Sequence, residues 1–430
     1  MISINRYNIL AFLFLIPLAF DFKGQYGGIF IQYLITFIVI VIGVYLCAKL
    51  KIKNKSNYSV IMTFIVIYTI IGGFLCFLVN DVLFENYIRV TVNWILFGLG
   101  LFVAMRYVNI GKNDCITSGI YAGGVISVLF TSVYGFISTG LNIGEVRYQI
   151  LSPVILIVEA LLIHNIFVER KKNLIDKFIL FLCFVLQLFS VTRSHLLAFV
   201  LILILALWVT YGSLVNIVHK DFSGLIVFLL AILIGSAILQ YIYPELINRW
   251  FIRILSSYET YGSDITTLTR LAEIKDQLNK WDEGILTILF GKGYGAYYGW
   301  DSVYDSELSY VFNISDLNGV NEFMPGHNLF VYTLFAGGLF FGLPFTFFII
   351  YIFIKSLIFM NKYRYKIYGN KTAKPFTIGL FLVFASLSIT IGGNPLGPRY
   401  SALLFGVGMG MLVSGFTFVK SSNHKYNSWG

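Results

Sequence analysis

Stretches of about 20 consecutive apolar residues recur along this chain of 430 residues. A run of that length crosses about 30 Å of hydrocarbon as an α-helix. Lipid offers no partners for free backbone groups, so helices are the expected spanning structure. The composition agrees, because 58% of the residues are hydrophobic and only 12% are charged, whereas an ordinary soluble domain has about 25% charged residues. We therefore expect an all-α membrane protein with many spans.

About twelve spanning helices are predicted, and the first of them is short and contains Pro17. The whole chain, 1–430, is expected to form one membrane domain. One polar and acidic run, residues 245–326, interrupts the apolar pattern between the ninth and tenth spans and is expected to form a large loop. The predicted spans are 8–20, 29–48, 59–80, 87–108, 116–138, 150–168, 177–192, 195–211, 224–243, 329–356, 375–392 and 400–419.

The distribution of basic residues predicts the orientation of the spans. With both termini on the cytoplasmic side, that side holds 20 of the 31 Lys and Arg residues, and six of the other 11 lie in the loop 245–326. An excess of Lys and Arg in cytoplasmic connections is the usual pattern of membrane proteins. The loop is therefore expected outside. The net charge of +10 follows from this topology, and we do not take it as a sign of nucleic-acid binding.

The loop 245–326 has its own predicted helices. Residues 245–258 form an amphipathic pattern that suits a helix lying in the membrane interface. A second helical pattern covers 268–281, with Asp264 or Thr266 as its cap. A glycine- and aromatic-rich segment, 291–300, follows, and residues 301–324 are expected to be irregular. None of the four cysteines lies in the loop, so no disulfide framework is expected, and no Cys or His spacing suggests a metal site.

Three side chains at the predicted outer face suit chemistry on a phosphate ester. Arg193 lies in a tight connection between two spans, and Arg270 lies on the second loop helix. Guanidinium groups bind phosphates through paired hydrogen bonds. His327 opens an apolar helix, and imidazole exchanges protons near neutral pH. Other roles stay open: Arg193 could extend to lipid headgroups, Arg270 could be a solvated helix charge, and His327 or Asn328 could cap the helix.

Further candidates surround these three. Aromatic rings in the segment 291–300 could stack on sugars, or they could pack on the membrane around a flexible turn; these are Tyr294, Tyr297 and Tyr298. The segment lacks the Gly-Lys-Ser/Thr sequence of a phosphate-binding P-loop. Arg399 is a third outer arginine. Glu307 or Glu322 could act as the base in place of His327.

These motifs together resemble those of the bacterial O-antigen polymerase and O-antigen ligase superfamily. The resemblance covers the topology of the whole chain, and its sequence motifs lie mainly in 190–196, 269–295 and 325–342. The residues that carry it are Thr192-Arg193-Ser194, Thr269-Arg270, Trp281, Phe290-Gly291-Lys292-Gly293-Tyr294-Gly295 and His327-Asn328-Leu329-Phe330, followed by Gly338 and Gly342.

The resemblance implies a membrane-embedded glycosyltransferase that needs neither a metal nor a cofactor and works on the periplasmic side of the bacterial inner membrane. Such enzymes pass a glycan from undecaprenyl pyrophosphate to a hydroxyl group. Arg193 and Arg270 would stabilise the charge of the leaving pyrophosphate, and His327 would take or orient the proton of the acceptor hydroxyl. The implied partners are the undecaprenyl-pyrophosphate-linked oligosaccharide and membrane lipid, and a chain-length regulator protein is a further candidate. The predicted substrate-binding residues are Asn328, Arg399, Tyr294, Tyr297 and Tyr298.

Within this class the polymerase is favoured over the ligase. A polymerase uses another lipid-linked repeat unit as acceptor, whereas a ligase uses the lipid A core. A lipid-linked oligosaccharide flippase is the alternative from another class. The missing paired half-repeats and the asymmetric outer loop argue against it. A purely structural protein is the remaining alternative, in which the Arg and His residues would cluster by coincidence.

Overall fold

The computed structural model describes residues 6–16, 29–50, 56–80, 82–140, 142, 146, 150, 152–212, 241, 244–259, 265–309, 312–313, 319–367 and 370–427. Regular structure in these ranges is helical, and the one β-type pairing among them is an isolated antiparallel bridge between Tyr298 and Glu322. The predicted ninth span, 224–243, lies almost wholly outside the described residues.

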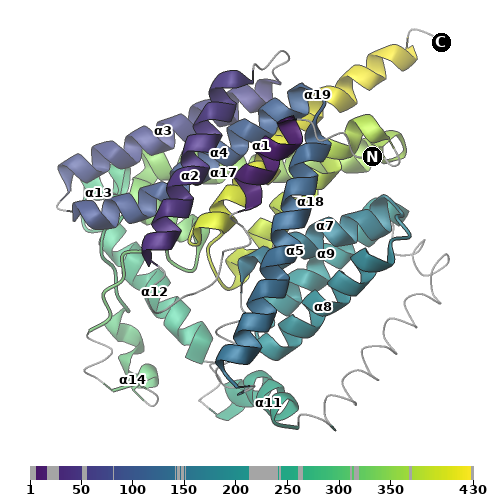
Figure 1. The fold of residues 1–430 in the computed structure, drawn as a ribbon. Helices are drawn as coiled ribbons and strands as arrows, with labels where there is room; N and C mark the ends of the chain where they lie inside the picture. The colour runs from purple at the N-terminus through teal and green to yellow at the C-terminus, as the bar shows by residue number, and fades with distance from the viewer. Residues whose placement is uncertain are drawn as a thin grey trace.

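The α-helices follow one another with short connections in most places (Figure 1). Their bounds are α1 Arg6–Leu15, α2 Ile29–Lys49, α3 Asn57–Val79, α4 Phe84–Asn109, α5 Asn113–Ser138, α7 Pro153–Ile163, α8 Leu174–Ser190, α9 Arg193–Tyr211, α11 Pro244–Glu259, α12 Ile265–Trp281, α13 Ile285–Phe290, α14 Asp305–Leu308, α16 Leu329–Gly337, α17 Leu343–Ile367, α18 Lys374–Ser388 and α19 Arg399–Asn427. Short π-helical and 3₁₀ turns connect some of them: η2 His164–Val168, η3 Ser302–Tyr304, η4 Gly338–Gly342, η5 Lys371–Ala373 and η6 Ile389–Ile391.

Seven helices in the described ranges are long and apolar enough to cross a membrane, which indicates an all-α membrane-embedded protein. They are α2, α3, α4, α5, α9, the continuous run from α16 to α17, and α19. The predicted number of twelve is not confirmed. Four of the remaining predicted spans fall on shorter helices, namely α1, α7 with η2, α8 and α18.

The centre of the fold is the packing of α19 against α4 and α18. The part of α19 that is apolar enough to cross a membrane, Arg399–Thr417, is buried over 94% of an 18-residue window. Glycines allow this close approach, since a Cβ on Gly406 would lie 2.0 Å from the Phe97 carbonyl oxygen and one on Gly379 would lie 2.4 Å from the Leu412 nitrogen. Small residues at helix contacts are typical of membrane proteins. Helices α2 and α3 pack against α4 and leave apolar side chains exposed, among them Phe37 and Phe64.

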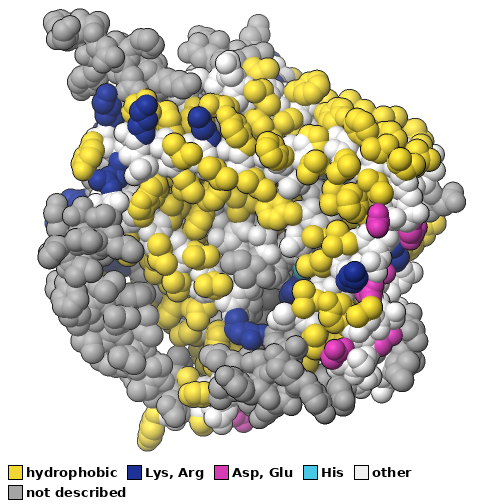
Figure 2. All heavy atoms as spheres, turned by 180° about the vertical axis from the view of Figure 1, so that it is seen from behind, with side chains coloured by type: hydrophobic (Ala, Val, Ile, Leu, Met, Phe, Trp, Pro, Cys, Tyr) yellow, Lys and Arg dark blue, Asp and Glu magenta, His cyan; other side chains and the backbone are white. Residues whose placement is uncertain are grey.

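An apolar surface separates two charged regions of the face in Figure 2. A group of Lys and Arg side chains lies at the upper left, whereas the Asp and Glu side chains lie mostly at the right, together with other Lys or Arg side chains. The ammonium of Lys374 lies 2.8 Å from the Asp114 carboxylate and 3.7 Å from that of Glu169. These contacts join the connections that follow α4, η2 and α17. The distribution of basic residues predicts all three on the cytoplasmic side.

The helices of the 245–326 region lie along the left and lower edges of Figure 1, and α19 ends at the upper right. The amphipathic helix predicted at 245–258 is α11. Its Trp250 indole donates a hydrogen bond to the Leu188 carbonyl (3.0 Å), and its Leu246 packs on Val191 in the α8–α9 connection. That connection is as tight as predicted, because Val191 takes a left-handed conformation (φ 48°) and α9 begins at Arg193.

Candidate functional site

The candidate site is built on a contact between α12 and the start of α16. Glu273 of α12 holds His327, which stands two residues before α16. The imidazole Nδ1 lies 2.5 Å from Glu273 Oε2, and the His327 backbone N–H donates to Oε1 at 2.7 Å. The Glu273 side chain is 5% exposed, whereas that of His327 is 52% exposed. The carboxylate is therefore buried behind an imidazole that faces outward.

This pairing decides which imidazole nitrogen can react. When Nδ1 donates its proton to a carboxylate, the lone pair of a neutral imidazole resides on Nε2. A buried carboxylate also stabilises the imidazolium that forms when Nε2 accepts a proton, as in hydrolase triads. The carboxylate fixes the orientation of His327, and this geometry is compatible with proton transfer at Nε2; a catalytic role for His327 stays a prediction.

Helix α12 positions the pair through its spacing. Arg270, Glu273 and Gln277 are separated by three and four residues, so they share one helix face. Gln277 is fully buried, and its side-chain amide donates to Glu273 Oε1 at 3.2 Å. Gly326 makes room for this arrangement, because a Cβ there would lie 2.2 Å from Glu273 Oε1 and 2.4 Å from the Gln277 amide nitrogen.

Asn328 is the N-cap of α16. Its side-chain oxygen accepts hydrogen bonds from the backbone N–H groups of Phe330 (3.0 Å) and Val331 (3.1 Å). The side-chain oxygen of Asn328 thus caps helix α16, which is the alternative role that the sequence left open. Its role in substrate binding stays a prediction.

The glycine-rich segment 291–295 is clamped against the spans. The backbone N–H groups of Lys292 and Gly293 donate to the carbonyls of Phe335 and Ala336, at 2.8 and 3.0 Å. Gly291 has φ +80°, and a Cβ there would lie 2.5 Å from the Ala336 backbone. Because these amides already have partners in α16, this segment does not present them as an anion cradle.

The three tyrosines of the segment differ in exposure. Tyr294 and Tyr298 are buried, whereas Tyr297 is 39% exposed. Tyr294 packs on Trp94 with ring centroids 5.1 Å apart, and the Tyr298 hydroxyl donates to the Met324 carbonyl at 2.8 Å. Burial raises the pKa of both phenols well above the ordinary value, so both stay neutral. Only Tyr297 of these three offers an accessible ring here, and the substrate-binding role of all three stays a prediction.

Acidic residues in the loop have other surroundings. Glu307 is exposed and accepts a hydrogen bond from the Ser306 hydroxyl (2.9 Å). Glu322 is also exposed, and its backbone pairs with that of Tyr298. Glu283 forms an ion pair with Lys292. In the described residues, the carboxylate that contacts His327 is Glu273, which the sequence analysis did not select.

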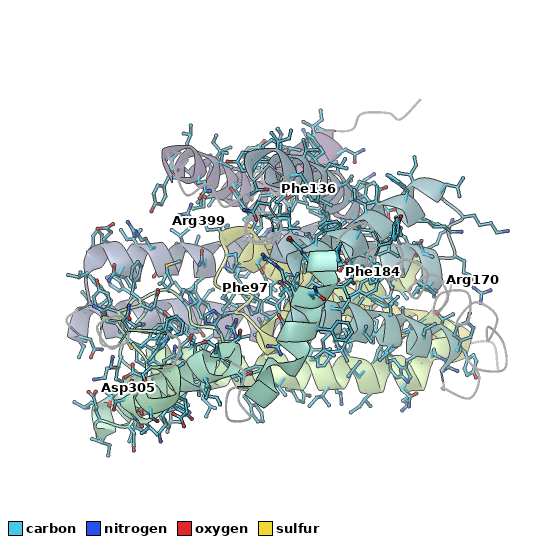
Figure 3. The ribbon with its side chains drawn as sticks, turned by 90° about the horizontal axis from the view of Figure 1, so that it is seen from below. Phe97, Phe136, Arg170, Phe184, Asp305 and Arg399 are labelled. Atoms are coloured by element: carbon cyan, nitrogen blue, oxygen red, sulfur yellow. The ribbon has the colours of Figure 1, made fainter. Side chains whose placement is uncertain are left out.

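The segment 389–399 lies beside the chain segments that carry Arg193 and His327, and it leads into Arg399. A Cβ on Gly392 would lie 2.4 Å from the hydroxyl of Ser194, the residue after Arg193, and one on Gly397 would lie 3.8 Å from the Pro325 carbonyl. Arg399 begins α19, with its guanidinium 4.6 Å from the centre of the Tyr33 ring. The chain segments that carry Arg193, Arg399 and His327 are therefore neighbours. In Figure 3, Arg399 and Asp305 lie on one side of the view and Arg170 on the other.

Glu273 could not be selected from the helical pattern. The apolar residues that predict this helix, spaced by three or four, are Leu268, Leu271, Ile274, Leu278 and Trp281. Leu268 is buried as this pattern predicts, whereas Leu271 is 42% exposed, and the buried face continues through Ala272, Glu273 and Gln277. The one available signal is that Glu273 follows Arg270 by a single helical turn.

Within the described part of the chain, no group of three or more His, Cys, Asp and Glu side chains is arranged to hold a metal ion. Comparisons with protein-family models and with curated proteins found no match for this chain.

Proposed function

We propose that this protein is a membrane glycosyltransferase that polymerises a surface polysaccharide, of the O-antigen type or a related one. It would transfer a glycan from undecaprenyl pyrophosphate to a hydroxyl of a second lipid-linked repeat unit on the periplasmic side of the inner membrane. The observation that carries the proposal is the contact between buried Glu273 and outward-facing His327. The motif resemblance supplies the substrate class, and the contact supports the presence of a general base.

In the proposed step, the acceptor hydroxyl oxygen attacks the anomeric carbon of the donor glycan. The hydroxyl proton passes to Nε2 of His327, and Glu273 stabilises the resulting imidazolium. The bond between the anomeric carbon and the pyrophosphate oxygen breaks, and undecaprenyl pyrophosphate leaves with the electron pair. Fixed cations lower the energy of that developing charge, and Arg270 lies one turn before Glu273 on the same face of α12.

Arg193 is the second proposed cation. It is the first residue of α9, and its neighbour Ser194 packs on the segment 389–399, which also approaches Pro325 before His327. This arrangement supports a shared site for a lipid-linked diphosphate, since the same segment lies beside both helix starts. Arg399, at the end of this segment, is a candidate for binding the lipid-linked donor.

The test is a reaction of the purified protein with lipid-linked repeat units, followed by separation of the product ladder. Arg193→Ala, Arg270→Ala and His327→Ala should each reduce polymer formation, by roughly 100- to 1000-fold for the loss of one electrostatic contact. Lys275→Ala is the matched control, because Lys275 is exposed on the same helix as Arg270. Normal ladders from all three variants, or an equal loss in the control, would dismiss the site.

The same assay separates the polymerase from its alternatives. Transfer only when the lipid A core is the acceptor would identify a ligase. Movement of the lipid-linked glycan across vesicles, without elongation, would identify a flippase.

A further inference from the structure

A polar cavity lies at the start of α8, the helix whose other end leads to Arg193 of the candidate site. It has a volume of about 280 Å³ and is lined by the starts of α5, α8 and α18, by the end of α7 and the start of η2, and by the connection between η2 and α8. Helix α8 ends at Ser190, beside Arg193, and begins near this cavity. Its 17 residues correspond to roughly 25 Å at 1.5 Å per residue. The cavity is thus a separate site on the predicted cytoplasmic side.

Two lysines line the cavity. The Lys171 ammonium donates to the Asn165 side-chain oxygen at 3.2 Å, and the Lys374 ammonium contacts Asp114 and Glu169. An ammonium has three N–H donors, so each lysine retains capacity for an anion. The Asp114 side chain is 75% exposed, and an exposed carboxylate offsets a lysine charge only weakly. The Glu169 side chain is 26% exposed, but its carboxylate lies farther from the Lys374 ammonium, at 3.7 Å.

The local backbone sets Lys171 in place. Helix α7 ends in the π-helical turn η2, and π-turns occur frequently at functional sites. After this turn the backbone N–H of Lys171 donates to the Asn165 carbonyl at 3.0 Å. The chain therefore folds back and brings the Lys171 side chain over the cavity.

The acid in the cavity wall already has partners. One oxygen of Asp176 accepts hydrogen bonds from the Tyr121 hydroxyl (2.9 Å) and the Asn173 amide (3.0 Å). The connection around it is basic, with Arg170, Lys172 and Lys177 all exposed. Two lysines in the cavity and three basic residues around it outnumber the three acids there, Asp114, Glu169 and Asp176, and this excess of positive charge favours an anionic ligand.

The surface beside the cavity indicates a lipid. On α8, next to Asn173 and Asp176, four large apolar side chains are between 62% and 77% exposed: Leu174, Ile175, Phe178 and Phe181. Acyl chains would cover such a surface, while a headgroup phosphate enters the cavity. Basic pockets between spanning helices on the cytoplasmic side are suited to anionic lipid headgroups.

We propose that the cavity between α5, η2, α8 and α18 binds the phosphate-bearing headgroup of an anionic phospholipid through Lys171 and Lys374. This site is independent of the proposed glycosyltransferase reaction.

The test titrates the purified full-length protein with short-chain phosphatidylglycerol and follows the thermal unfolding midpoint. Phosphatidylcholine with the same chains and inorganic phosphate are the comparison probes. A ligand that binds only the folded state raises the midpoint in a saturable manner. Phosphatidylglycerol should do so. Lys171→Gln and Lys374→Gln should each weaken its apparent affinity roughly tenfold, as expected for the loss of a charge-assisted hydrogen bond.

Lys172→Gln is the matched control, because Lys172 is adjacent, exposed and outside the cavity lining; its affinity should stay within about twofold of wild type, well under the tenfold loss of one charged hydrogen bond. An equal loss in this control would show general surface attraction and overturn the proposal. So would an absence of saturation, or equal stabilisation by phosphatidylcholine or inorganic phosphate. If Lys374→Gln lowers the midpoint without lipid, Lys171→Gln decides the outcome, since its side chain is exposed.

Discussion

Replacing Glu273 by Gln tests whether the carboxylate itself makes His327 a base. Glutamine has the same shape and keeps one oxygen for the His327 backbone N–H. Its NH₂ group would then face Nδ1, which now lies 2.5 Å from a carboxylate oxygen. An NH₂ group cannot accept the Nδ1 proton, so the imidazole must place its proton on Nε2. The atom that should receive the acceptor proton is then blocked.

The expected magnitude follows from this change of tautomer. In a serine protease triad, the corresponding change from carboxylate to amide lowers kcat by about 10⁴ while the geometry is kept. General-base catalysis by a positioned side chain contributes about 10²–10⁴-fold. We therefore expect Glu273→Gln to lower kcat for polymerisation by roughly 10²- to 10⁴-fold, with little change in KM because the donor's charge is bound elsewhere.

Stability measurements separate this effect from a general loss of packing. Glu273→Ala removes the acceptor for the His327 backbone N–H and the Gln277 amide, and each buried group left without a partner costs about 1–3 kcal/mol. Glu273→Gln preserves most of these bonds and should unfold close to wild type. The assay is initial-rate kinetics on lipid-linked repeats, with thermal unfolding of each variant alongside.

Asp276→Asn is the control on the same helix. Its carboxylate accepts from the Gly299 backbone N–H (2.6 Å) and pairs with Lys280 (3.0 Å), so it has a structural contact but none to the imidazole. The reasoning fails if Glu273→Gln retains wild-type kcat, or if Asp276→Asn loses activity to the same degree.

Three other predictions concern the framework of the site. Gly291→Ala should destabilise the protein by more than roughly 1–3 kcal/mol, because its φ of 80° and ψ of 178° suit glycine alone and its Cβ would also meet the α16 backbone. Gly140→Ala, with φ +55° and open space, is the comparison at positive φ without a contact, and equal losses in thermal denaturation would contradict the contact. Asn328→Ala should cost about 1 kcal/mol through the lost helix cap while Asn328→Asp should not, as measured by denaturant unfolding. In a cysteine-free background, Glu307→Cys should react with a membrane-impermeant maleimide from the periplasm and Lys172→Cys only after lysis; labelling of both from one side would refute the topology.

The apolar runs in the sequence predicted the positions of the long helices. The spans expected at 29–48 and 59–80 correspond to α2 and α3 within about two residues at each end, because the thickness of the bilayer sets the length of a spanning helix. The shorter helices were less predictable. The span expected at 150–168 instead consists of α7 followed by a π-turn, which no apolar pattern records.

The faces of the helices could not be predicted. In a membrane, side chains that face lipid and side chains that face the protein interior are both apolar, so periodicity carries little information about burial. Phe64 is 67% exposed and Phe97 is fully buried, although both lie in similar apolar runs. Glu273 was hidden for a different reason, because α12 belongs to the polar loop and the burial of Glu273 depends on α16 docking against α12.

Arg193, Arg270 and His327 were selected because their side chains suit phosphate binding and proton exchange. Sequence reasoning placed them on one side of the membrane, but it could not supply the partner of His327. The two residues of the pair are 54 positions apart and meet only through the tertiary fold. Chemistry-bearing residues were therefore visible in the sequence, whereas their arrangement was not.

Gly326 imposes a constraint that has nothing to do with reactivity. The main chain passes so close to the carboxylate of Glu273 that even one methyl group would push against its oxygen. In a saturation-mutagenesis screen for polymer production, position 326 should therefore tolerate as few substitutions as position 327, although it contributes no functional group. A loss of polymer on substitution at position 326 would show how much space the buried Glu273 carboxylate requires.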